Sequence, residues 1–190
     1  MKALEQRILT DGKVLPGGIL KVDGFLNHRI DPQLCYEMAQ ELKRLYEGAG
    51  ANKILTIEAS GIALGCMTGY VFRSPLVFAK KSKTRNISDN LWSVKVKSFT
   101  HGNRNTVIVS KEYLGPGDRV LIVDDFLATG AALIGLKALV EQAGGTVVGA
   151  GIAIEKAFQG GGDKLRAQGL RVESLAKIAR MTDNGIEFCD

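Results

Sequence analysis

The sequence predicts an α/β fold: an open, mostly parallel, twisted sheet flanked by helices. Two nearly continuous apolar segments, 119–124 and 147–154, are typical of strands buried on both faces of such a sheet. Between them, residues 129–143 repeat apolar positions at helical spacing and end at a glycine pair. A strand, a helix and a strand within about 35 residues form a βαβ unit, whose two strands run parallel.

Elements of the same kind are expected along the first half of the chain. Residues 1–10 predict a short amphipathic helix, and 15–18 predict a turn. Asp31-Pro32 is a typical helix start, an N-cap residue followed by proline, and apolar residues at 3.6-residue spacing continue the helix to Leu45. The next expected elements are a strand, a helix and a buried strand, at 53–58, 61–72 and 75–79.

The second half begins with a polar, basic segment without periodicity, at about 82–92, which we interpret as a mobile loop. Alternating apolar and polar residues then predict an antiparallel strand pair, 91–99 with 106–109. After the βαβ unit, 170–178 and 186–188 add short strand-like pieces.

Composition indicates one globular domain. The chain has 190 residues, of which 45% are hydrophobic and 24% charged.

No apolar run could cross a bilayer, and the first residues lack a secretory signal, so we expect a cytoplasmic protein with no membrane partner. The three cysteines, Cys35, Cys66 and Cys189, are too far apart for a zinc motif and favour free thiols in a reducing compartment.

The net charge of +5 suits a small polyanionic ligand as well as it suits nucleic acid. Lys80 and Lys81 follow a buried strand, and more basic residues occur within 82–85. A charge run of this kind is usually a solvated face, but its place after a core strand favours a lid over an anionic substrate. Aromatic residues do not alternate with these charges, so nucleic acid is not expected as a partner.

The strongest chemical signal follows the strand at 119–124. Asp124 and Asp125 come at its end, placed to accept hydrogen bonds from vicinal hydroxyls or to face a metal-bound diphosphate. Five small residues follow, Ala128, Thr129, Gly130, Ala131 and Ala132. They allow backbone N–H groups at a helix start to close around a phosphate. Acids and a small turn could merely cap the helix, but a solvated turn does not require such small residues. The segment therefore predicts a sugar-phosphate site.

At these residues the chain resembles the type I phosphoribosyltransferases, whose phosphoribosyl diphosphate signature is similar to residues 120–130. Other stretches resemble the xanthine-specific members, and the resemblance covers nearly the whole chain. These stretches are Leu20–His28, Ile30–Pro32, Thr56–Ile62, Ile154–Lys156 and Arg171–Ala176. The resemblance implies a single domain, 1–190, with the type I fold and a small hood built from about 12–30 and 155–190.

The same resemblance implies a function in purine salvage: transfer of the 5-phosphoribosyl group of phosphoribosyl diphosphate to xanthine, which releases diphosphate. It places Ala59, Ser60 and Lys81 at the diphosphate. It assigns the base to Leu20, Asn27 and Lys156, which offer the donors and the acceptor that a ring with two carbonyl oxygens requires. It also implies Mg²⁺, held mainly by the substrate diphosphate and not by protein ligands, and a homodimer.

Several alternatives stay open. Ser60 could simply cap a helix, and His28 and His101 are interpreted as surface or structural residues. Ala128 stands where enzymes for hypoxanthine and guanine usually have an aspartate that serves the purine N7, so no general base is assigned. The acceptor could instead be hypoxanthine, guanine or adenine. A regulatory protein that senses phosphoribosyl diphosphate is a further alternative, although about 30 residues before Asp31 are too few for a winged helix.

Overall fold

The computed structural model describes residues 1–81, 90–97, 104–182 and 185–189. Six strands form its central sheet: β3 (Lys53–Ile57), β4 (Leu76–Ala79), β7 (Arg119–Leu127), β8 (Thr146–Lys156), β9 (Val172–Thr182) and β10 (Gly185–Phe188). Their order is β10-β9-β8-β7-β3-β4. All neighbours run parallel except β10, which is antiparallel to β9. The predicted α/β fold with a mostly parallel sheet is confirmed.

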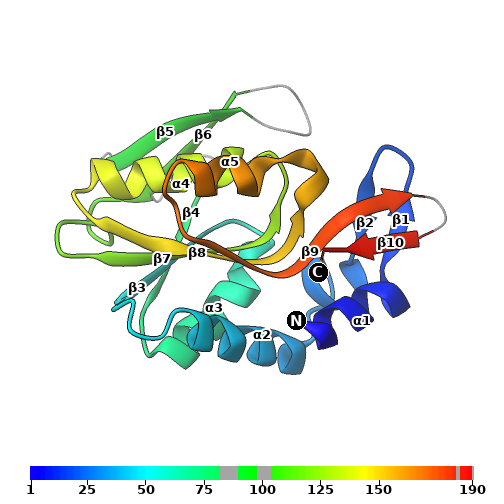
Figure 1. Ribbon diagram of the computed structural model, residues 1–190. Coiled ribbons are helices and arrows are strands. Elements are labelled where there is room, and N and C mark those ends of the chain that lie inside the picture. The colour runs from blue at the N-terminus through cyan, green and yellow to red at the C-terminus, as the bar shows by residue number, and fades with distance from the viewer. Residues whose placement is uncertain (82–89, 98–103, 183–184, 190) are drawn as a thin grey trace.

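Helices cover both faces of this sheet (Figure 1). On one face lie α2 (Pro32–Leu45) and α3 (Gly61–Phe72); on the other lies α4 (Ala131–Gln142), beside the antiparallel pair β5 (Leu91–Lys97) and β6 (Arg104–Ser110). Side chains of β7 alternate between the two faces. Leu121 and Val123 join the apolar cluster that includes α2 and α3, whereas Val120 and Ile122 join the cluster that includes α4. The βαβ unit β7-α4-β8 is therefore confirmed, with a core on either side.

The start of α2 shows why the sequence signal was strong. The Asp31 side chain accepts a hydrogen bond from the N–H of Leu34 at 3.1 Å, which satisfies one free donor of the first turn. Pro32 occupies the first helical position, where its missing N–H costs nothing. Lys43 and Arg44 in the last turn complement the helix dipole.

The N- and C-terminal segments meet at one end of the molecule. Before α2 come α1 (Lys2–Asp11), a hairpin of β1 (Lys13–Leu15) and β2 (Ile19–Lys21), and a short π-helix, η1 (Asp23–Asn27). Figure 1 shows α1, β1, β2 and β10 gathered there. Leu4 and Ile8 of α1 are fully buried in the same cluster as Ile178 of β9. The segments from which we expect a hood, about 12–30 and 155–190, contribute β1, β2 and β10 to this end.

Two predicted boundaries next to the predicted sugar-phosphate site are wrong. The expected strand stopped at Asp124, but β7 continues to Leu127 because its last residues still pair with β8. Ladder hydrogen bonds come from the backbone and do not require apolar side chains. The helix that follows begins at Ala131 and not at Thr129, since Gly130 has a left-handed φ of 84°.

Several short elements are absent from the sequence prediction. They are the hairpin strands β1 and β2, η1, a 3₁₀ turn, η2 (Ala157–Gln159), and α5 (Gly161–Ala167). The glycine run 160–162 argued against a helix there. The predicted mobile loop at about 82–92 lies outside the described residues except for 90–92, where Leu91 and Trp92 begin β5, and His101 lies outside them too. Within the described ranges, no helix is both long and apolar enough to cross a bilayer.

Candidate functional site

The carboxyl ends of β3 and β7 lie side by side, because these two strands pair in parallel. Asp124 of β7 and the first residue of α3, Gly61, are in close contact at this edge. A β-carbon at Gly61 would lie 2.1 Å from Thr56 Oγ1 and 2.9 Å from Asp124 Oδ1, so only glycine fits. Thr56 Oγ1 is buried and has no hydrogen-bond partner among the residues that the structure describes.

The two aspartates form a buried carboxylate pair. Asp124 and Asp125 are 4% and 6% exposed, and the Asp125 N–H donates to Asp124 Oδ1 at 3.0 Å. Burial, and then the charge of Asp125, raise the pKa of Asp124 well above its usual range, while the ammonium group of Lys81 opposes the rise. A buried carboxylate pair without a fixed partner is typical of a site that receives hydroxyl groups or a cation.

The segment after β3 connects to the end of β4. The Glu58–Ala59 peptide is cis. The Lys81 N–H donates to Glu58 Oε1 at 2.8 Å, so the loop expected to hold diphosphate and the residue expected to contact it are joined directly. Ser60 precedes α3 but its side chain makes no capping hydrogen bond, which leaves the hydroxyl available. Glu58 was not singled out from the sequence, and only its place at a strand end could have suggested it.

The small-residue turn 128–132 leads into α4 as expected. The left-handed Gly130 turns the chain so that the first N–H groups of α4, which have no partner inside the helix, lie at the carboxyl end of β7. Thr129 is exposed. The first turn of α5 packs on this segment, since a β-carbon at Gly161 would lie 2.2 Å from the carbonyl oxygen of Ala128. This turn has the form of a phosphate site.

The residues expected to bind the base come from three elements. Lys156 ends β8, and its Nζ donates to the carbonyl oxygen of Gly18, in the turn just before Leu20, at 2.9 Å. Burial lowers the pKa of Lys156. The side chain of Leu20 is only 5% exposed, so only its backbone could contact a ligand. Asn27, at the end of η1, has a buried Oδ1 that accepts no hydrogen bond from the described part of the chain, as expected of a group that receives a ligand N–H.

Two aromatic rings are near this region. The Phe126 ring lies under Lys156, with Nζ 5.6 Å from its centroid, and Phe158 in η2 is 46% exposed. Either ring could stack on a planar base.

In the described parts of the chain, no group of three or more His, Cys, Asp and Glu side chains could hold a metal ion. Asp124 and Asp125 nevertheless offer the carboxylate oxygens that Mg²⁺ prefers. They fit an ion that brings most of its ligands with a substrate.

Comparison with known proteins places the chain in a family. A phosphoribosyl transferase domain matches residues 23–167. The chain therefore belongs to the phosphoribosyltransferase family. Among curated relatives, xanthine phosphoribosyltransferase of Finegoldia magna is 51% identical over 190 residues, the whole of both chains. Xanthine phosphoribosyltransferase of Bacillus cereus strain AH187 is 49% identical over 188 residues, 99% of this chain and 95% of that protein. Among solved structures, adenine phosphoribosyltransferase of Rhodothermus marinus superposes with a TM-score of 0.76 at 27% identity, covering 92% of this chain and 97% of that one.

Proposed function

We propose that this protein transfers the 5-phosphoribosyl group of phosphoribosyl diphosphate to xanthine in purine salvage. The C1–O bond to diphosphate breaks, a bond forms between C1 and a ring nitrogen that bears a free lone pair, and the base loses one proton from its other imidazole nitrogen. The observation that carries the proposal is the buried pair Asp124–Asp125 beside the small-residue turn of α4, in a chain about half identical throughout to xanthine phosphoribosyltransferases.

The turn at 128–132 would hold the 5′-phosphate. Its backbone N–H groups and the Thr129 hydroxyl are donors, and the N-terminal dipole of α4 favours the negative charge. Asp124 and Asp125 would then accept hydrogen bonds from the two ribose hydroxyls or face the diphosphate through a metal ion. With both ends of the sugar held, C1 is presented in line between the leaving group and the base.

The departing diphosphate gathers negative charge, which the other end of the site would stabilise. Lys81 supplies a positive charge, and Ala59 and Ser60 supply the backbone and hydroxyl donors. When bound, Mg²⁺ would neutralise part of the diphosphate charge. The Glu58 carboxylate would fix this arrangement, since it accepts the Lys81 N–H.

The base end favours an oxopurine. The Lys156 ammonium group is a charged donor suited to a carbonyl oxygen, and Asn27 Oδ1 is a free acceptor for a ring N–H. The backbone next to Leu20 can cover another edge of the ring. Xanthine ionises readily, so a xanthine monoanion would be attracted to Lys156 and would have less need of a general base at N7.

The decisive assay supplies the purified protein with phosphoribosyl diphosphate, Mg²⁺ and one of four bases, and measures nucleotide and diphosphate by chromatography. We expect xanthosine 5′-monophosphate with the highest kcat/KM, then guanine or hypoxanthine products, and least with adenine. A preference for another base would correct the acceptor. Binding of phosphoribosyl diphosphate without turnover of any base would favour the regulatory alternative.

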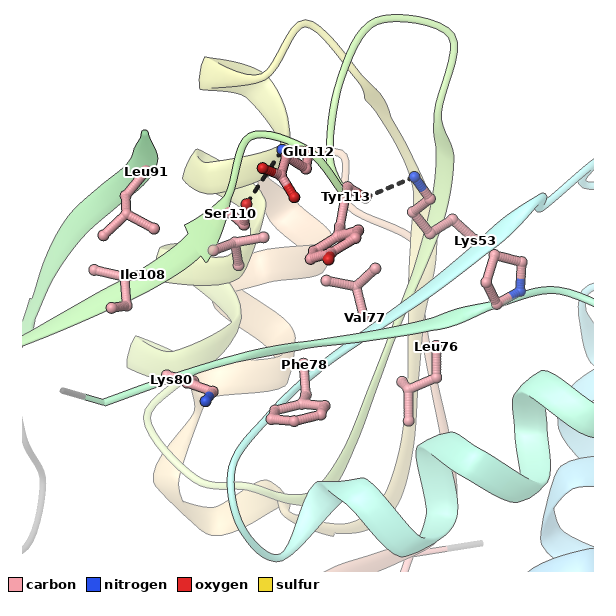
Figure 2. Close-up of a pocket in the computed structure, with 12 residues that line it drawn as sticks. Lys53, Leu76, Val77, Phe78, Lys80, Leu91, Ile108, Ser110, Glu112 and Tyr113 are labelled. Atoms are coloured by element: carbon pink, nitrogen blue, oxygen red, sulfur yellow. Dashed lines mark hydrogen bonds between the residues drawn. The ribbon is translucent and has the colours of Figure 1, made fainter. Parts of the chain in front are cut away.

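We propose in addition that the protein is a homodimer, joined along the free edge of β4. A groove of about 630 Å³ lies between this edge and β6, and among the described residues a single bridge, between Lys80 and Ile108, pairs the end of β4 with β6. Figure 2 shows Val77 and Tyr113 on one side of β4 and Phe78 on the other. Phe78 and Tyr113 are 39% and 59% exposed. A second copy would cover the free strand edge and these rings.

This edge continues into the site, since β4 leads to Lys80 and Lys81. Light scattering after gel filtration should give twice the mass of one chain, and Phe78→Glu should halve it. Leu9→Glu, which replaces an exposed apolar residue on α1 (52% exposed), is the control. A monomeric parent protein at micromolar concentration would refute the dimer.

We place the protein in the cytoplasm. All three cysteines, Cys35, Cys66 and Cys189, are unpaired, which agrees with a reducing compartment.

A further inference from the structure

A buried ion pair joins β8 to α5, directly beside the proposed base and phosphate sites. Glu155 is 1% exposed. Arg166 of α5 donates to it twice, Nη1 to Oε1 at 2.9 Å and Nη2 to Oε2 at 2.7 Å, and the Ser174 hydroxyl of β9 donates to Oε2 as well. Burial has the largest effect on the pKa of Glu155 and raises it, but the hydrogen bonds from Arg166 and Ser174 outweigh it, so the pKa is lowered.

The Glu155–Arg166 pair holds α5 in direct contact with β8. The Arg166 Nε also donates to the carbonyl oxygen of Val172 at 3.1 Å, which fixes the guanidinium plane. At Gly162, a β-carbon would lie 2.0 Å from Glu155 Oε1. The first turn of the helix therefore lies against the carboxylate with no room for a side chain between them.

The neighbouring glycine lies against the phosphate turn. A β-carbon at Gly161 would lie 2.2 Å from the carbonyl oxygen of Ala128 and 2.7 Å from the nitrogen of Gly130. The Leu165 side chain, one residue before Arg166 and 1% exposed, also lies close to Gly130. One face of α5 thus contacts both the Glu155 carboxylate and the backbone that would bind the 5′-phosphate.

Glu155 also links α5 to the proposed base site. Glu155 precedes Lys156 in β8 and pairs in register with Leu127 of β7, the residue before the phosphate turn. A movement of Glu155 would displace Lys156 and the start of the turn together. Glu155 is buried while Arg166 is 30% exposed, and an ion pair of this kind adds little net stability compared with apolar residues of the same volume, so its contacts with α5 and β8 suggest a positioning role.

We propose that the Glu155–Arg166 pair is a positioning unit that holds the 5′-phosphate turn and the base-binding end of β8 in one geometry. The proposal rests on the proposed function, because it concerns the two substrate subsites named there. Neither residue touches substrate; both act through α5 and through Lys156.

The test is the variant Arg166→Gln, compared with Arg180→Gln, which removes an exposed arginine that pairs with Glu187 far from the turn. The expected result is a rise in KM for both phosphoribosyl diphosphate and xanthine, with kcat/KM lowered about 10- to 100-fold, since a displacement near 1 Å has effects of this size. Arg166→Lys restores one donor and should recover part of the loss. Arg180→Gln should match the parent.

A merely structural role gives a different pattern: less folded enzyme, a lower apparent kcat and unchanged KM values. Because Arg166→Gln leaves a buried carboxylate unpaired and could fail to fold, the double variant Glu155→Gln/Arg166→Gln removes both charges and should show the same KM increases. Folded variants with parental KM values would overturn the proposal while leaving the proposed function intact. A parent protein that turns over no purine would overturn both.

Discussion

Replacing Lys156 by methionine removes the ammonium group and keeps an unbranched side chain of similar length. If that group donates to a carbonyl oxygen of xanthine, its loss removes one charge-assisted hydrogen bond, which is worth about 1.5–3 kcal/mol. At about 1.4 kcal/mol per factor of ten, kcat/KM for xanthine should fall about ten- to a hundredfold. The bond from Nζ to Gly18 is lost too. We therefore expect stability to fall by about 1 kcal/mol, or about 2–4 °C in Tm.

The assay is steady-state transfer with xanthine and with adenine, at a temperature well below the melting transition. Adenine has no ring carbonyl oxygen, so any activity toward it should not fall with the variant. Lys137→Met is the matched control, because Lys137 lies on α4 and pairs only with Glu141 among the described residues. A folded Lys156→Met enzyme with the parental kcat/KM for xanthine would refute the base-site geometry.

Further substitutions test other parts of the site. Asp124→Asn removes a buried charge while its amide oxygen can still accept the Asp125 N–H, so transfer should slow while calorimetry shows a Tm raised by about 2–4 °C for each kcal/mol relieved. Burial raises the pKa of Asp124, so the ionised carboxylate destabilises the folded state of the parent protein. The difference in Tm should be largest at high pH and vanish at low pH, and a pH-independent difference would contradict the account. Thr129→Ala removes a phosphate donor and should raise KM for phosphoribosyl diphosphate about tenfold with little change in KM for xanthine. A higher KM for xanthine with an unchanged KM for phosphoribosyl diphosphate would contradict the phosphate role of Thr129. Gly130→Ala forces a side chain into a left-handed φ of 84°, at a cost of about 1–2 kcal/mol, read as a lower Tm and weaker calorimetric binding of phosphoribosyl diphosphate. Finally, kcat/KM for xanthine should rise with xanthine deprotonation and fall on the alkaline side as Lys156, whose pKa burial lowers, loses its proton; a flat profile would exclude the monoanion.

The order of strands and helices was predictable because most elements carry their own local signals. The Asp31–Pro32 helix start, the apolar strand at 119–124 and the helix at 61–72 are present where the pattern indicated. The continuation of β7 beyond Asp124 was not predictable, since it depends on pairing with β8. The polar residues Asp124 and Asp125 suggested the end of the strand, but backbone pairing with β8 extends β7 to Leu127.

Some features of the site were likewise predictable from local sequence, and others depend on contacts between distant segments. Asp124, Asp125 and the turn 128–132 are contiguous in the sequence, so their proximity follows from one strand and one helix start. The contact of Lys156 with Gly18 joins residues 138 positions apart, and no local pattern indicates it. The Glu155–Arg166 pair depends on α5, whose glycine run hid the helix from sequence reasoning.

The most direct measurement is a crystal structure of the protein with phosphoribosyl diphosphate and Mg²⁺. The account predicts the 5′-phosphate among the N–H groups of 129–132, the ribose hydroxyls toward Asp124 and Asp125, and diphosphate beside Ala59, Ser60 and Lys81. Sugar phosphate bound elsewhere, or a turn left without phosphate at saturating concentration, would contradict it.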